Sequence, residues 1–168
     1  MTGQRKFYIE KLALDARERL IEKEIIEKNQ KALSNYDLTK IVSFYGGELQ
    51  FVSEPKETYI KKVDDKAYII YYYSQSNNYM QVIHELGHAF LNLDDMEIGQ
   101  EYFSNGFVDE DTEAALFARA FVMPRYTFEP TVIEHLNDGK FCIQNVAEEY
   151  EIDYLEVLAR GEELHIGR

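Results

Sequence analysis

The segment His84-Glu85-Leu86-Gly87-His88 places three reactive residue types at a spacing that suits hydrolytic chemistry. Residues four positions apart lie on one face of a helix, so the two imidazoles would project toward the same point. Two neutral imidazoles at that spacing can bind a zinc ion. Glu85, beside the first of them, can accept a proton from a water on that metal. The motif therefore indicates metal-assisted hydrolysis, most often of a peptide bond.

The residues around this motif predict a buried helix. Apolar side chains occupy most positions from Tyr79 to Leu93, and a helix that is apolar nearly all round packs inside a protein. Two buried histidines and a buried glutamate need partners that offset their loss of hydration, and a metal ion supplies one. The alternative is that both histidines are ordinary helix residues, which the apolar surroundings disfavour.

A catalytic zinc site usually has three protein ligands and leaves a fourth position to water. One known arrangement takes the third ligand from shortly after the second histidine, beyond a turn glycine. Here Leu91 and Asp94 occupy the glycine and ligand positions, so this arrangement is disfavoured.

A second arrangement takes a glutamate from another helix. The segment 113–124 is rich in helix formers, Asp109 and Asp111 precede it as candidate caps, and Pro124 is placed to end it. Glu113 lies on its apolar face, where a carboxylate should have a cation nearby. We predict Glu113 as the third ligand, in preference to Glu110, Glu101 and Asp94. The alternative for Glu113 is an exposed place in the first helical turn, favoured by the helix dipole.

The motif HELGH, followed at residues 113–124 by E-A-x-x-F-A-x-x-F-x-M-P, resembles the ImmA/IrrE metallopeptidases of bacteria and their mobile elements. The strong match covers residues 84–124, and a weaker similarity to the family's closing helices continues from Asn145 to Arg160. The resemblance implies that His84, His88 and Glu113 bind one zinc ion and that Glu85 is the catalytic base, a gluzincin-like arrangement. Ala115 departs from the asparagine usual in the family, which removes a supporting hydrogen bond but no ligand.

Length, cysteine content and charge limit the kind of protein that could carry this chemistry. A chain of 168 residues is expected to form a single domain over residues 1–168. The lone Cys142 excludes an internal disulfide, and the sequence contains no signal peptide and no apolar run of membrane length. We therefore expect a cytoplasmic protein that does not enter a membrane. The formal net charge of −13 disfavours direct binding to nucleic acid and favours a basic protein partner.

Periodicity predicts an α+β fold: a mostly helical single domain with a small antiparallel sheet packed against the HExxH helix. The N-terminal helix is expected over about 8–33, a short helix over 37–45, and the sheet over about 48–73. Metal-binding helices are expected over about 76–93 and 110–123, and closing helices over about 126–163. The polar segment 94–109 is expected to be either a substrate-gating loop or a plain surface loop.

The resemblance implies a regulatory protease whose substrate is a helix-turn-helix DNA-binding repressor of a mobile element or stress response. The alternative is a non-proteolytic interaction or toxin-like protein that retains a structural zinc site. An edge strand, with 67–73 as the candidate, would bind the substrate chain by strand addition. Candidates for stabilising the oxyanion are His135, His165, Tyr126 and Arg125.

Overall fold

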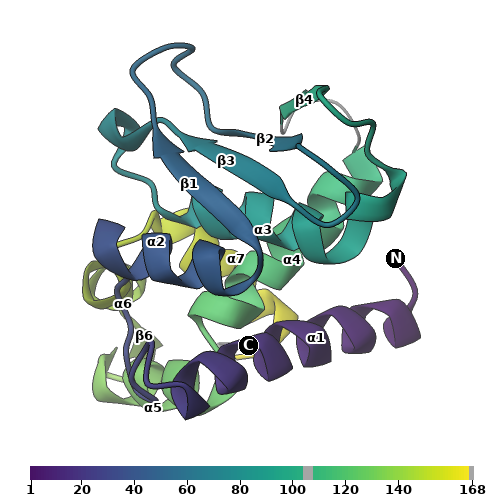
Figure 1. Ribbon diagram of the computed structural model, residues 1–168. Helices are drawn as coiled ribbons and strands as arrows, with labels where there is room; N and C mark the ends of the chain where they lie inside the picture. Colours follow the sequence, from purple (N-terminus) through teal and green to yellow (C-terminus); the bar gives the residue numbers. More distant parts are fainter. Residues whose placement is uncertain (104–107, 167–168) are drawn as a thin grey trace.

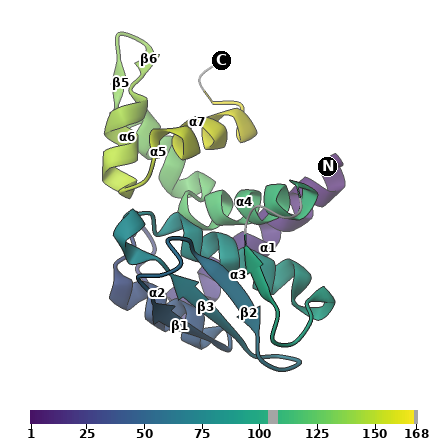
Figure 2. The same cartoon turned by 90° about the horizontal axis from the view of Figure 1, so that it is seen from above.

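The computed structural model of the chain describes residues 1–103 and 108–166, with side chains in the fourth helix described from Asp111 onward. It confirms the expected α+β fold, in which a small sheet lies on one side of a mostly helical domain (Figure 1). Seen from above, helices α3 (Met80–Asn92) and α4 (Val108–Val122) lie between the sheet and the C-terminal helices (Figure 2). The segment that carries the motif is therefore the middle layer of the fold.

The sheet is mixed, whereas the sequence predicted an antiparallel one. Its strands are β1 (Gly47–Phe51), β2 (Tyr59–Lys62), β3 (Tyr68–Tyr72) and β4 (Glu101–Phe103), in the order β1-β3-β2-β4. β2 pairs antiparallel with both β3 and β4, but β1 pairs parallel with β3. The strand that follows β1 in the sequence, β2, does not pair with it. The apolar strand β3 lies between them instead. β4 lies in a stretch expected to be a loop.

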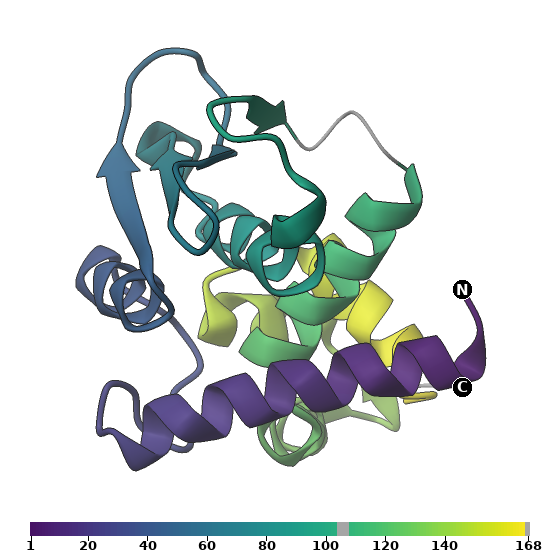
Figure 3. The ribbon, with the colours of Figure 1, turned by 45° about the vertical axis from the view of Figure 1, so that its right-hand side comes forward.

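Helix α1 (Gly3–Glu22) begins at a Thr2 cap and runs along the base of the molecule beside α4 (Figure 3). It ends eleven residues before the expected boundary at residue 33. The reason is that its apolar face stops at Leu20, because the next positions on that face are charged. One of them, Glu24, has a φ of 56° and turns the chain. The left-handed conformation at Glu24 thus prevents the helix from continuing toward residue 33.

Helix α2 (Asn35–Phe44) starts with a capping box in which Ser34 and Asp37 satisfy each other's backbone amides. Short 3-10 turns η1 (Ser74–Ser76) and η2 (Leu93–Asp95) flank α3. α3 packs more extensively on α4 than on any other element, with the Phe90 and Phe117 ring centroids 5.1 Å apart. The core therefore surrounds the α3–α4 pair.

The C-terminal part agrees with the expected closing helices. It comprises α5 (Arg125–Glu134), a hairpin of β5 (Leu136–Asn137) and β6 (Lys140–Phe141), α6 (Ile143–Tyr150) and α7 (Tyr154–Glu163). Arg119 of α4 pairs with Glu156 and Glu163 of α7 at 3.2 and 2.7 Å, which joins the two helices. Within the described residues, no helix has the length and apolar character needed to cross a bilayer.

Candidate metal centre

A close approach between α3 and α4 positions the candidate site. A Cβ built on Gly87 would lie 3.1 Å from the Ala114 carbonyl oxygen and 3.2 Å from the Ala114 Cα. The motif glycine therefore lets the two backbones meet. His84 lies one turn before Gly87 in α3, and Asp111 lies one turn before Ala114 in α4, so both residues are close to this contact.

Three side-chain atoms converge there. The Nε2 atoms of His84 and His88 are 3.2 Å apart. Asp111 Oδ1 lies 3.4 Å from His84 Nε2 and 3.1 Å from His88 Nε2. Among the described residues, these three form the group of histidine, cysteine and acidic side chains whose donor atoms could hold a metal ion.

The spacing of the three atoms fits one face of a tetrahedral zinc site. Zinc bonds of about 2.0–2.1 Å to nitrogen or oxygen place neighbouring ligands of a tetrahedron about 3.3 Å apart. The observed triangle has sides of 3.1, 3.2 and 3.4 Å. Two imidazoles and one carboxylate also form a donor set suited to zinc. The residues present therefore fit the metal that the motif predicts.

Burial keeps the His84 imidazole in the neutral form that binds metal. Loss of hydration, reinforced by the neighbouring His88, lowers the pKa of His84 to about 4, although Asp111 acts in the opposite direction. His88 Nδ1 lies 3.2 Å from the Asn92 side-chain oxygen. With Nδ1 donating a proton to that oxygen, the lone pair of Nε2 faces His84 and Asp111.

Glu85 is almost completely buried, with 1% of its surface exposed. It follows His84 directly in α3 and precedes Gly87, so it belongs to the helical turn that meets α4. The sequence prediction that this helix is buried is confirmed at Glu85, Gly87 and His88.

Glu113, the predicted third ligand, has a different partner in the structure. Its carboxylate accepts hydrogen bonds from Arg5 Nε and Nη2 of α1, at 2.8 and 2.6 Å. These bonds hold the pKa of the Glu113 carboxyl below its ordinary value. The sequence analysis expected a cation beside this acid, and in the structure that cation is the guanidinium group of Arg5. The acid that the structure brings to His84 and His88 is Asp111, which the sequence analysis treated as a helix cap.

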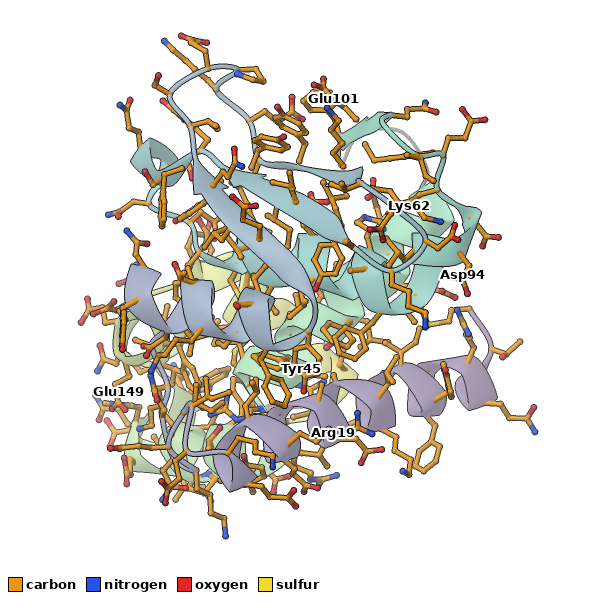
Figure 4. The ribbon with its side chains drawn as sticks, viewed as in Figure 1. Arg19, Tyr45, Lys62, Asp94, Glu101 and Glu149 are labelled. Atoms are coloured by element: carbon orange, nitrogen blue, oxygen red, sulfur yellow. The ribbon has the colours of Figure 1, made fainter. Side chains whose placement is uncertain are left out.

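The other acids considered as ligands lie away from the histidine pair or outside the described side chains. Asp94 in η2 and Glu101 in β4 are exposed and project outward from the protein (Figure 4). The side chain of Glu110 lies outside the described residues. The structure thus offers no direct support for these three alternatives.

The four candidates for an oxyanion donor are engaged elsewhere or exposed. His135 pairs with Glu149, and Arg125 pairs with Glu129 at 2.7 Å. The Tyr126 hydroxyl accepts a hydrogen bond from the buried Arg17 at 3.1 Å. His165 is exposed, in a left-handed turn after α7. None of them lines a pocket beside the histidine pair.

Two pockets adjoin the site. A pocket of about 320 Å³ includes His88 and Asp111 in its lining, together with residues from η2 to β4. A smaller pocket of about 160 Å³ includes His84 in its lining and extends toward Glu156 of α7. The prediction that strand 67–73 is an edge is wrong, because β3 lies between β1 and β2. The edge strand beside the larger pocket is β4, which contributes Tyr102 and Phe103.

Two residues of the site escaped the sequence reasoning. Asn92 follows His88 at the same helical spacing that relates the two histidines, so the i,i+4 pattern alone could have indicated it. Asp111 gave a weaker signal, because an acid near a helix start has the common explanation of a cap. Its role depends on where α4 crosses α3, which the motif does not encode.

The part of the chain that contains this site matches a known protein family. A protein-family model described as Peptidase_M78, IrrE N-terminal-like domain, matches residues 51–161. The match covers most of the sheet, both helices of the candidate metal centre and the closing helices. Among curated proteins, none matches this chain.

Proposed function

Because the chain belongs to the Peptidase_M78 family of IrrE-type metallopeptidases, we propose that it is a zinc-dependent peptidase whose site lies between α3 and α4. The observation that carries the proposal is the convergence of His84 Nε2, His88 Nε2 and Asp111 Oδ1 within 3.4 Å of one another. Two histidines and one acid would hold a single ion and leave its fourth position open, as catalysis requires.

The third ligand that the contacts favour is Asp111. Glu113 is the ligand that the family resemblance implied, and it would have to leave two hydrogen bonds to Arg5 in order to reach the histidines. Asp111 needs no such exchange, since its oxygen already lies beside both imidazoles. We therefore propose Asp111 as ligand, with Glu113 as the alternative that mutation distinguishes.

The metal and the side chains of the protein would have different roles in the reaction. A zinc ion at this site would lower the pKa of a bound water and polarise the substrate carbonyl. Glu85 accepts the proton of the attacking water and returns it to the amine that leaves. Asn92 orients His88 through Nδ1, and Arg5 keeps the carboxylate of Glu113 ionised and turned toward α1.

The substrate chain has a binding edge in β4. An extended peptide that pairs with the side of β4 that no described strand occupies would pass the pocket that His88 and Asp111 line. β4 replaces strand 67–73 as the candidate for strand addition, because the backbone groups of β3 already pair with strands on both sides. Strand addition supplies affinity through backbone hydrogen bonds, so the sequence preference must come from the pockets.

The test of the proposed activity is Glu85→Gln, which removes the base and keeps the shape. We expect about one zinc per chain in wild type and in Glu85→Gln, with hydrolysis of a helix-turn-helix repressor encoded beside the gene lost only in the variant. Hydrolysis that persists in Glu85→Gln at the wild-type rate would contradict the role of Glu85. A repressor that binds but is never cut, under activating conditions too, would favour a non-proteolytic partner with a structural zinc site.

A repressor substrate and a cytoplasmic location remain proposals drawn from the family resemblance, the single cysteine and the acidic composition. An acidic protein of net charge −13 attracts a basic one, and DNA-binding repressors carry a basic surface. The same charge disfavours direct contact of this chain with nucleic acid.

A further inference from the structure

The part of the chain that builds the candidate site contains acids but no lysine or arginine. No lysine or arginine occurs between Lys66 and Arg119, a stretch that includes β3, α3, β4 and most of α4. Many of the acids in the stretch follow the histidine motif: Asp94, Asp95, Glu97, Glu101, Asp109, Glu110, Asp111 and Glu113. Among the described acids of this stretch, Asp94, Asp95, Glu97 and Glu101 are exposed, so a peptide that approaches the segment from η2 to β4 meets several carboxylates.

The larger pocket beside the histidine pair concentrates that charge next to apolar walls. Two exposed acids, Asp95 and Glu97, contribute to its lining, and so do Met96, Tyr102 and Phe103. The residues described as lining it include no lysine or arginine. Lys62 lies on the neighbouring strand β2 (Figure 4). It is largely buried and is not part of the lining.

The wall of this pocket is held in shape by hydrogen bonds. The Tyr102 hydroxyl accepts a hydrogen bond of 2.7 Å from the Glu97 backbone nitrogen, which fixes the segment between η2 and β4. Met96, between the two acids, is buried with 8% of its surface exposed. Asp95 and Glu97 therefore flank an apolar anchor and lie at the solvent side of the pocket. Such a pocket suits a side chain with an apolar stem and a cationic head.

We propose that this pocket selects a lysine or arginine next to the scissile bond of the substrate, with Asp95 and Glu97 as the specificity-determining residues. The inference rests on the proposed peptidase function, because His88 and Asp111 place the pocket directly beside the metal centre. The methylene stem of the basic side chain contacts Tyr102 and Phe103, and its charged head pairs with the two carboxylates.

The experiment compares two double variants that change the net charge equally. Asp95→Lys/Glu97→Lys reverses the pocket, whereas Glu18→Lys/Glu22→Lys reverses two exposed acids of α1 that line no described pocket. Zinc-loaded proteins digest a peptide mixture prepared by cleavage at acidic residues, so that lysine and arginine remain internal. Mass spectrometry of the products gives the residue at each position around the cut.

We expect cuts of the wild type to be enriched in lysine and arginine at one position flanking the scissile bond. Two exposed ion pairs correspond to a preference of about ten-fold, which should disappear in the pocket variant and persist in the α1 variant. The neutral pair Asp95→Asn/Glu97→Gln should weaken the preference without reversing it. Raising the salt concentration should reduce it as well.

Cleavage without a preference for lysine or arginine would overturn the inference and leave the peptidase proposal intact. An equal loss of that preference in the pocket variant and in the α1 variant would have the same consequence. If no peptide and no repressor is cut, under activating conditions too, the peptidase proposal fails. Binding then decides the inference: zinc-loaded Glu85→Gln is titrated with blocked peptides that differ only in carrying arginine, glutamine or glutamate at one position. A preference for arginine that only the pocket variant removes supports the pocket, and equal binding of the three peptides refutes it.

Discussion

Replacing Gly87 by alanine should weaken both the fold and the metal site, because the new methyl group meets the backbone of α4. Its Cβ would lie 3.1 Å from the Ala114 carbonyl oxygen, 3.2 Å from the Ala114 Cα and 3.2 Å from Phe117 Cδ1. Two of these three atoms are backbone atoms, which cannot rotate away. The two helices must therefore separate by a few tenths of an ångström.

Two opposing effects set the magnitude. Alanine is favoured over glycine inside a helix by about 1 kcal/mol. Overpacking at a tight helix contact costs about 1–3 kcal/mol. The expected net change is a loss of about 0–2 kcal/mol in the free energy of unfolding. Asp111 lies one turn from Ala114 and moves with it, so zinc affinity should fall on the order of ten-fold.

The assay is urea unfolding in the presence of a chelator, followed by a zinc titration against a competing chromophoric chelator. Gly3→Ala is the matched control, since a Cβ on Gly3 meets nothing within 4 Å. The control should be unchanged or more stable by up to about 1 kcal/mol. If Gly87→Ala is equally stabilised and its zinc affinity equals that of wild type, the close helix contact does not position the site.

Three further predictions concern the surroundings of the histidines. Arg5→Met should cost less than about 1 kcal/mol, because the Arg5–Glu113 pair is partly exposed, and should leave zinc content unchanged. Asn92→Ala should reduce zinc affinity about 10- to 100-fold through the lost orientation of His88, measured by the same titration. The metal-free protein should lose about 2 kcal/mol of unfolding free energy between about pH 7.5 and about pH 5, measured in urea, because the pKa of His84 is lowered to about 4.

The sign of the pH effect follows from proton binding. Between the folded pKa of about 4 and the model value of 6.5, the unfolded chain binds more protons at His84 than the folded one. Stability therefore falls as the pH falls through that window and is constant above it. Carboxyls whose pKa the fold lowers, such as Glu113 and Glu149, act at lower pH. A flat profile between pH 7.5 and pH 5, or the same profile in His84→Asn, would contradict the burial of this imidazole.

Zinc loss from Arg5→Met, or full zinc affinity in Asn92→Ala, would contradict the contacts of those residues.

Features that depend on local spacing could be predicted from the sequence. The helical period of His84 and His88 predicted their convergence, and the apolar residues around them predicted the burial of α3. Pro124, read as the end of the second metal-binding helix, lies two residues after the end of α4, and helices α5, α6 and α7 follow it. The α+β class followed from the same patterns, because periods of 3.6 and 2 separate helices from strands.

Features that depend on long-range contacts could not be read in this way. The order of strands depends on pairings between distant segments, which place β3 between β1 and β2 and leave β4 at an edge. The pairing of Glu113 with Arg5 joins residues 108 positions apart. The place of Asp111 depends on the crossing point of α3 and α4, which the contact at Gly87 fixes. Local patterns carry none of this information.

The most direct test of the metal centre is the zinc content of Asp111→Asn beside that of Glu113→Gln. Each variant removes one carboxylate charge from α4 and keeps the side-chain shape. After chelation and reloading with equimolar zinc, wild type and Glu113→Gln should retain about one ion per chain, and Asp111→Asn should bind at least on the order of 100-fold more weakly. Full retention in Asp111→Asn with loss in Glu113→Gln would contradict the assignment and make Glu113 the third ligand.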